Sequence, residues 1–145
     1  MTRIEESINI KCPIDKVFAY TTDVQSWSKW LTGLTDAEQT SAGQMAVGST
    51  YKWTAYRMGL RMKVTARVTG YEPNKWWSHD IFSGSSVIND TLLFDPIEEG
   101  TKFTLRWDVK LAGFLKMLSP VFMRSLRKHV KAALNNIKTI LEVQT

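Results

Sequence analysis

The hydrophobic period of the chain changes once along its length, and this change restricts the fold more than any other feature. Between residues 34 and 110, apolar side chains recur mostly at every second position, which is the period of a half-buried β-strand. Short turn signals separate the alternating runs; they are Met58-Gly59, Pro73-Asn74, Ser83-Gly84-Ser85 and Glu99-Gly100. Such short gaps predict antiparallel pairing, because parallel strands need long crossover connections. We expect about six strands in this region.

The alternation also predicts which side chains face inward. Three strands can be assigned in this way, with inward positions Val47, Ser49, Tyr51, Trp53 and Ala55 in the first, Leu60, Met62, Val64, Ala66 and Val68 in the second, and Phe103, Leu105, Trp107 and Val109 in the last. Two more strands are expected near residues 75–82 and 86–95. The basic residues Arg61, Lys63 and Arg67 alternate with the second inward set, so they should form a stripe on the outer face.

The beginning of the chain predicts one strand followed by two short helices. Residues 3–11 alternate between isoleucines and polar side chains, as a half-buried strand does. Pro13 ends this strand and suits the first position of a helix over residues 13–21, where its missing N–H costs nothing. A second short helix can be capped by Asp23 and ends at Gly33. It carries Trp27, Trp30 and Leu31.

The last part of the chain predicts a long amphipathic helix, because its apolar period becomes three to four. The apolar face carries Phe122, Leu126, Val130, Ala133, Leu134, Ile137 and Leu141. The opposite face carries Arg124, Arg127, Lys128, Lys131, Asn135 and Lys138. We expect His129 to face solvent among these basic residues, and Pro120 either begins or kinks the helix. About 22 residues give a rod of roughly 33 Å, so this helix must cross the whole sheet.

The composition is that of a soluble globular protein. The chain has 145 residues, of which 43% are hydrophobic and 23% charged, near the averages of globular domains. This length predicts one domain over residues 1–145 with a core that folds without disulfide bonds. The single cysteine, Cys12, excludes an intrachain disulfide and suits a reducing compartment. No apolar run reaches the length of a membrane span, and the charged start lacks an export signal, so we expect a cytoplasmic protein.

The expected architecture leaves space between the sheet and the terminal helix. A strongly twisted antiparallel sheet curls, and a straight helix on its concave side cannot touch every inward position. The sequence holds six tryptophans and six methionines, more large adaptable side chains than a minimal core requires. We therefore expect an apolar cavity for a small molecule. Its predicted lining is Tyr51, Trp53, Met62, Leu105, Trp107, Phe122 and Leu126. The competing interpretation is that these side chains simply fill the core.

The order of these elements resembles the helix-grip fold of the START-like (SRPBCC) superfamily, which includes polyketide cyclase/dehydratase-like, coenzyme-Q-binding and pollen-allergen-like proteins. The resemblance spans essentially the whole chain. It rests on residues 12–18 after the first strand, Asp23-Val24 followed by Trp27 and Trp30, Val47-Gly48, Tyr71-Glu72-Pro73, Phe94-Asp95-Pro96 with Gly100-Thr101, and the closing helix from Leu134 to Glu142. It implies an α+β fold in which a seven-stranded curved antiparallel sheet surrounds a long C-terminal helix. These motifs mark turns and core positions, so they are specific for the fold and not for a function.

Two polar residues are candidates for acid or base chemistry. Asp90 shares a strand face with Ile88 and Leu92, so its carboxyl group would enter the apolar space, where desolvation raises a carboxyl pKa. His79 or its neighbour Asp80 would also face inward, and the alternation does not distinguish them. The alternative is a structural role, such as a pairing of Asp90 with an arginine like Arg106.

The familiar catalytic and metal templates do not match the sequence. His79, His129 and Cys12 lack the clustered spacing of a zinc site, so we expect no metal. Gly84-Ser85-Ser86 lacks the second glycine of a nucleophile elbow. The run Gly43–Thr50 resembles a phosphate-binding loop, but Ser49 stands where the lysine is required and a strand follows. We expect no cofactor.

The excess of 19 basic over 14 acidic residues, a net charge of +5, raises the question of an anionic partner. Nucleic acid is disfavoured, because the basic residues face outward while the aromatic residues mostly alternate inward. An anionic membrane surface fits better. An apolar cluster of Phe114, Leu115, Met117, Leu118, Val121, Phe122 and Met123 stands directly before Arg124, Arg127 and Lys128. The same cluster could instead form a lid over the cavity.

These features predict a carrier or sensor for a small hydrophobic ligand, lipid-like or aromatic, held between the sheet and the C-terminal helix. One alternative is an enzyme of the cyclase/dehydratase type, in which Asp90 or His79 moves a proton on an enolisable substrate. Another is a module that contacts a protein or a membrane through the basic helix.

Overall fold

The computed structural model describes residues 2–143. Its elements are β1 (Thr2–Ile10), α1 (Ile14–Thr22), a short 3₁₀ helix η1 (Val24–Ser26), α2 (Trp27–Trp30), β2 (Leu34–Gln39), β3 (Thr50–Arg57), β4 (Leu60–Glu72), β5 (Trp76–Ser83), β6 (Ser86–Ile97), β7 (Gly100–Lys110), α3 (Phe114–Met117) and α4 (Ser119–Val143). Within these residues, seven strands form one antiparallel sheet in the order β1-β7-β6-β5-β4-β3-β2. The predicted helix-grip architecture is confirmed.

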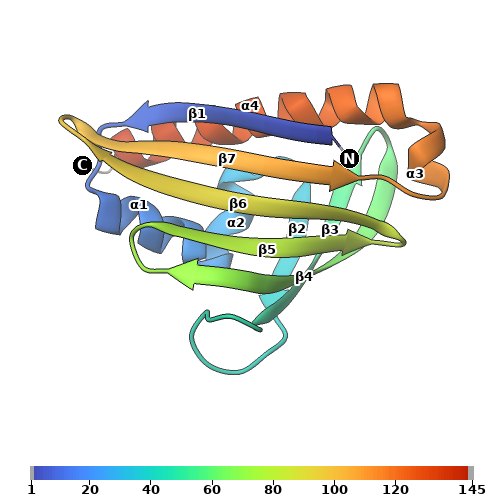
Figure 1. Ribbon diagram of the computed structural model, residues 1–145, viewed down its shortest axis with the longest axis horizontal. Helices are drawn as coiled ribbons and strands as arrows, with labels where there is room; N and C mark the ends of the chain where they lie inside the picture. The colour runs from blue at the N-terminus through green and yellow to red at the C-terminus, as the bar shows by residue number, and fades with distance from the viewer. Residues whose placement is uncertain (1, 144–145) are drawn as a thin grey trace.

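The sheet curls because its strands twist against one another. Figure 1 shows β2 and β3 running at a steep angle to β1, β6 and β7. The inward faces follow the predicted alternation: Tyr51 and Ala55 in β3, and Val64 in β4, are buried, while the intervening Lys52 and Lys63 are exposed. One part of the prediction is wrong. Val47 belongs to the loop before β3 and is exposed, because the strand begins only at Thr50.

The long helix α4 lies along β1 and β7, with α3 at its beginning and α1 near its end (Figure 1). Its buried side chains recur at three and four positions, as predicted; they are Phe122, Met123, Leu126, His129, Val130, Ala133, Leu134, Ile137 and Leu141. Pro120 occupies the second position of the helix, where its missing N–H leaves no internal bond unmade. The helix therefore begins at Ser119, directly before this proline, and the proline does not interrupt it.

The short helix α2 places the indole rings of Trp27 and Trp30 inside the curl of the sheet. Asp23 caps η1 through its carboxylate, which accepts a hydrogen bond from the backbone N–H of Gln25 at 3.0 Å. Trp27 donates its indole N–H to the backbone oxygen of Thr21 at 2.8 Å. Gly33 then returns the chain to the sheet with φ of 81°, and a Cβ at this position would lie 2.6 Å from the backbone oxygen of Tyr56. The glycine thus lets the turn after α2 approach β3 closely.

Candidate functional site

An apolar cavity lies inside the curl of the sheet, between β3–β7 and the helices α2, α3 and α4. Its volume is about 100 Å³. An apolar cavity of ~150 Å³ can hold a benzene molecule, so this space is smaller than a cavity that holds one aromatic ring. A guest of one or more rings therefore requires side chains or the α3 segment to move. The wall is formed chiefly by indole, aliphatic and thioether groups, among them Trp27, Trp53, Ala55, Met62, Val64, Ile88, Trp107, Leu115, Phe122 and Leu126.

Five of the seven side chains predicted to line the cavity do so. They are Trp53, Met62, Trp107, Phe122 and Leu126. The other two predicted residues, Tyr51 and Leu105, are not among the side chains that line this cavity. Leu105 is fully buried opposite Leu92 of β6 and Glu6 of β1, and it belongs to the packed core.

Tyr51 lies too far along β3 to reach the cavity. Its ring packs against that of Trp27 with a centroid distance of 4.9 Å. It borders a second hollow instead, together with Gln39, Met45 and Tyr71. That hollow is larger, at about 410 Å³, but it is open to solvent and mostly polar. Because small-molecule sites are enclosed and mostly apolar, we take the first cavity as the candidate site.

Two polar residues of the cavity wall were not predicted from the sequence. His129, expected to face solvent, is only 8% exposed and lines the cavity together with Arg57. For both residues, the spacing in the sequence indicates an inward-facing side chain. His129 follows Phe122 and Leu126 at the four-and-three spacing of the apolar face of α4, and Arg57 has the same parity as Trp53 and Ala55 in β3. Their charge and polarity obscured this spacing.

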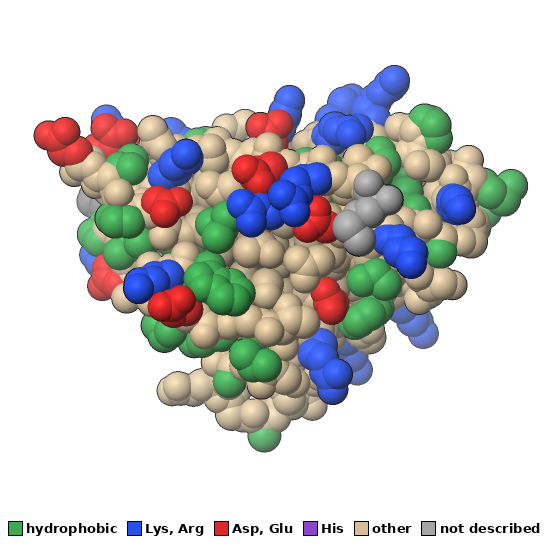
Figure 2. Space-filling model, viewed as in Figure 1, with side chains coloured by type: hydrophobic (Ala, Val, Ile, Leu, Met, Phe, Trp, Pro, Cys, Tyr) green, Lys and Arg blue, Asp and Glu red, His purple; other side chains and the backbone are tan. Residues whose placement is uncertain are grey.

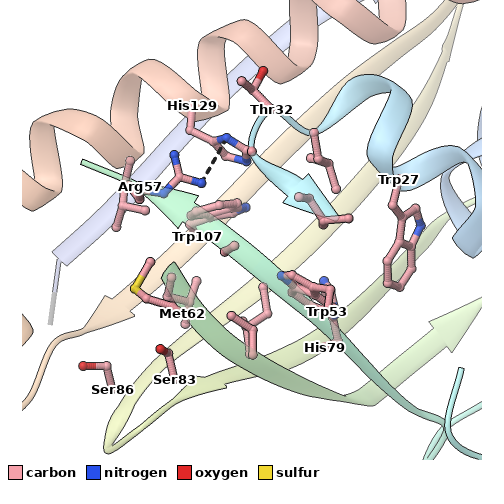
Figure 3. Close-up of a pocket in the computed structure, with 18 of the residues that line it drawn as sticks. Trp27, Thr32, Trp53, Arg57, Met62, His79, Ser83, Ser86, Trp107 and His129 are labelled. Carbon is pink, nitrogen blue, oxygen red and sulfur yellow. Dashed lines mark hydrogen bonds between the residues drawn. The ribbon is translucent and has the colours of Figure 1, made fainter. Parts of the chain in front are cut away.

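Arg57 and His129 are joined by a hydrogen bond. Nη2 of Arg57 donates to Nδ1 of His129 over 3.3 Å (Figure 3). A guanidinium can only donate, so Nδ1 carries the lone pair and the ring proton of neutral His129 is on Nε2. Burial, and secondarily the charge of Arg57, lower the pKa of His129 to about 3. Burial also lowers the pKa of Arg57, which nevertheless keeps its charge at neutral pH.

Trp107 adds a further donor beside this pair. Its ring centroid lies 5.6 Å from that of His129. Its indole N–H is buried and has no hydrogen-bond acceptor within residues 2–143. In Figure 3 Arg57, His129 and Trp107 gather on one side of the cavity, whereas His79, Trp53 and Trp27 lie on the other. One side of an otherwise apolar cavity thus carries N–H donors.

The structure resolves which of the neighbouring residues His79 and Asp80 faces inward. His79 lines the cavity, and its Nε2 lies 3.0 Å from Oδ2 of the buried Asp90. The two residues are direct cross-strand partners in β5 and β6. Asp80 faces the other side of the sheet and accepts a hydrogen bond from Asn89 at 2.9 Å. Arg106, considered as a partner of Asp90, pairs instead with Glu5 over 2.7 Å, because it lies on the outer face.

The pair of His79 and Asp90 keeps free hydrogen-bonding capacity. Nδ1 of His79 and Oδ1 of Asp90 are buried without a partner in the described part of the chain. Trp77 packs against His79 with a ring-centroid distance of 4.8 Å. Asp90 does not line the cavity and stands behind His79, so it can orient the imidazole. Across residues 2–143, no group of three or more His, Cys, Asp or Glu side chains is arranged to hold a metal ion.

The segment from α3 to the start of α4 forms the rim of the cavity. Leu115 points into the cavity, while Phe114, Met117 and Val121 are 61%, 80% and 55% exposed. Figure 2 shows hydrophobic side chains projecting at the end of the molecule where Figure 1 places α3, with Lys and Arg side chains nearby. None of the helices within residues 2–143 is both long enough and apolar enough to cross a membrane.

A second basic surface lies on the outer face of the sheet. Arg61, Lys63 and Arg67 are exposed there, as the alternation predicted. Two aromatic side chains share this face, since Tyr56 is the cross-strand partner of Arg61, and Phe82 that of Thr65.

A curved antiparallel sheet that encloses an apolar cavity with a long terminal helix defines a helix-grip protein of the START-like (SRPBCC) class. The family described as "Polyketide cyclase / dehydrase and lipid transport" matches residues 1–142, and the chain belongs to this family. No curated protein matches the sequence.

Several solved structures are similar to this one. The protein TTHA0849 from Thermus thermophilus has a TM-score of 0.83 at 16% identity, with 99% of each chain covered. The Zhui aromatase/cyclase from a Streptomyces species has a TM-score of 0.82 at 14% identity, with 99% of this chain and 94% of that chain covered. Ara h 8.0201 has a TM-score of 0.67 at 14% identity, with 94% and 97% covered. At such identities the similarity establishes the fold.

Proposed function

We propose that the protein binds a small hydrophobic molecule in the cavity between the sheet and α4, as a carrier or sensor. The observation that supports this most is the enclosed apolar wall, to which β3–β7 contribute Trp53, Met62 and Trp107 and α4 contributes Phe122 and Leu126. Removing apolar ligand surface from water supplies about 25 cal/mol per Å². The family description includes lipid transport, which agrees with this proposal.

The proposal is tested with Prodan, an uncharged naphthalene dye whose emission shifts to the blue in apolar surroundings. We expect a saturable blue shift with one dye per protein molecule. Native mass spectrometry of protein purified from its own host provides an independent measurement, and a co-purifying apolar molecule is the expected result. The absence of both a Prodan shift and a bound molecule would contradict the proposal.

A second candidate function is catalysis of the cyclase/dehydratase type. The specific observation that favours it is the buried contact of His79 with Asp90 at the cavity wall. Asp90 can hold the imidazole in one orientation, and the free Nδ1 of His79 can then exchange a proton with an enolisable guest. The solved structure of an aromatase/cyclase with the same fold makes this chemistry a reasonable comparison.

We also propose that the rim segment formed by α3 and the first turns of α4 touches an anionic membrane surface transiently. Phe114, Met117 and Val121 expose apolar side chains there, and the exposed Arg124 and Arg127 follow directly in α4. Apolar side chains flanked by basic ones are typical of interfacial helices. Because Leu115 of the same segment lines the cavity, a displacement of α3 at the membrane would open a path for the ligand.

The compartment that fits these properties is the cytoplasm. Cys12 is a free, buried thiol, and burial raises its pKa, which keeps it unreactive. A free thiol suits a reducing compartment.

A further inference from the structure

Arg57 places a positive charge at the wall of an apolar cavity. Within residues 2–143 its guanidinium has no carboxylate partner, and its hydrogen bond to the uncharged His129 leaves the charge unbalanced. Two other arginines of the sheet are neutralised on its outer face, where Arg3 pairs with Asp108 and Arg106 with Glu5. Arg57 is partly buried, so its charge is partly withdrawn from water, and without a counter-ion this costs free energy. A bound anion would balance this charge.

The groups next to Arg57 are donors rather than acceptors. Nδ1 of His129 is used by Arg57, so this ring offers only its Nε2–H. Trp107 offers a buried indole N–H that has no acceptor in the described chain. Asp90 is the one acidic residue among the buried side chains of residues 2–143, and its Oδ2 is engaged by His79. The side of the cavity around Arg57 thus presents the N–H groups of His129 and Trp107 beside one positive charge.

We infer that the ligand is an organic carboxylate, whose carboxylate group binds Arg57 and whose apolar body lies against Trp53, Met62 and Phe122. This inference rests on the proposed function and names the chemical class of its ligand. A guanidinium can bind a planar carboxylate through two parallel hydrogen bonds. The N–H groups of His129 and Trp107 then donate to the remaining lone pairs. With one positive charge present, a monoanion is balanced, whereas a phosphate monoester would bring a second, uncompensated charge.

The volume of the cavity favours small ligands. About 100 Å³ of space is less than the ~150 Å³ of a cavity that holds benzene, so a one-ring or short-chain acid needs only a small adjustment of the rim, and a larger ligand needs a larger one. The apolar side chains around Arg57 lower the local dielectric, which strengthens an ion pair there. We therefore expect aromatic or short-chain carboxylic acids to bind more tightly than their uncharged analogues of the same shape.

The experiment compares benzoate with benzamide, which has nearly the same shape without the charge. Calorimetric titration of the wild-type protein should show at least tenfold tighter binding of benzoate. In Arg57→Met the ratio of the two affinities should fall to about one, whatever the change in the affinity for benzamide itself. Arg57→Lys should restore part of the preference, since it keeps the charge and loses the paired donors. Arg61→Met, on the outer face of the neighbouring strand, is the matched control and should bind like wild type.

Each alternative outcome has a distinct meaning. Equal affinities of wild type for the two compounds, or a preference that survives in Arg57→Met, would overturn the carboxylate assignment while leaving the proposed function intact. Tighter binding of phenyl phosphate than of benzoate would replace the carboxylate by a phosphate ester and also overturn it. Binding of none of the three compounds, together with no Prodan shift, would contradict both the inference and the proposed function. Should Arg57→Met fail to fold, Arg57→Gln serves in its place, with circular dichroism as the check on folding.

Discussion

The guanidinium of Arg57 at the end of β3 donates a hydrogen bond to Nδ1 of His129 in α4 across 3.3 Å, although the two residues are 72 positions apart in the chain. The contact joins the sheet to the helix at the wall of the cavity. It makes the imidazole a neutral Nε2–H tautomer and leaves the charge of the arginine without a counter-ion in the described residues.

The unbalanced charge at this contact predicts that the unliganded protein is less stable than a variant with apolar side chains at both positions. Replacing both polar groups in Arg57→Met/His129→Leu should raise the free energy of unfolding by about 1–2 kcal/mol, because apolar side chains of similar volume often stabilise a site that held buried polar groups. Urea unfolding followed by circular dichroism measures the change. The same variant should lose its preference for benzoate over benzamide. A double variant that is less stable than wild type would show that the Arg57–His129 contact is itself a net source of stability.

The depressed pKa of His129 predicts a pH dependence of stability. In the unfolded chain this group titrates near 6.5 and in the folded protein near 3, so between these values the unfolded state binds more protons. The contribution of His129 is therefore fully present above pH 6.5 and is lost progressively as the pH falls toward 3. Between pH 7.5 and 5.0, wild type should lose about 1–2 kcal/mol more than His129→Gln. Urea unfolding at the two pH values measures this difference.

Nuclear magnetic resonance of the ring nitrogens provides the control for this pH prediction. His129 should remain uncharged at pH 5.0, with its proton on Nε2. An imidazolium signal for His129 at that pH would contradict both the pKa and the assigned tautomer.

The position of the cavity predicts that a larger side chain at residue 64 of β4 weakens ligand binding, whereas the same change at residue 65 does not. The side chain of Val64 lines the cavity, whereas that of Thr65 faces outward and is exposed. Val64→Phe should therefore weaken Prodan binding at least tenfold by occupying the space, at a cost of about 1–3 kcal/mol in stability from overpacking. Thr65→Phe adds the same ring on the other face and should bind Prodan normally. Equal binding by both variants would place the dye outside the cavity.

Substitutions of His79 and Asp90 distinguish catalysis from ligand binding, because they should lower turnover without changing affinity. With an enolisable polyketide-like substrate, His79→Gln and Asp90→Asn should lower turnover by about 10²-fold or more, as expected for the loss of a general acid or base. Their Prodan affinity should change little. Asp80→Asn, on the outer face of the same strand, is the matched control. Unchanged turnover in both inward variants, or no turnover by wild type, would leave the pair with a structural role only.

The rim segment predicts binding to anionic lipid. Sedimentation with vesicles containing phosphatidylserine should retain the wild-type protein, and vesicles of phosphatidylcholine alone should not. Phe114→Ser/Met117→Ser and the triple change of Arg124, Arg127 and Lys128 to Glu should each weaken retention at least tenfold, while Arg61→Glu/Lys63→Glu on the outer sheet face serves as the control. If the triple change leaves lipid binding intact but removes a protein partner in a pull-down, the basic helix is a protein contact instead.

The sequence by itself determined the elements and their faces. Alternation placed Trp53 and Val64 inward and Lys63 outward, and the three-to-four spacing assigned the buried side of α4, because each period reports a local geometry of the backbone. The tertiary structure alone decided which inward positions meet empty space. Leu105 and Trp107 have the same parity in β7 and both are buried, yet Leu105 is packed in the core and only Trp107 lines the cavity.

The positions of the polar residues in the cavity wall also depended on the tertiary structure. Periodicity could not choose between His79 and Asp80, since both faces of β5 carry aromatic and polar side chains. His129 was assigned to the solvent by its residue type and Arg57 was assigned to neither face, although the spacing of both residues already indicated inward faces. Their contact depends on how the curl of the sheet brings β3 toward α4, which is a property of long-range packing. A local period records the direction of a side chain, whereas its neighbours across the fold are set only when the sheet closes on the helix.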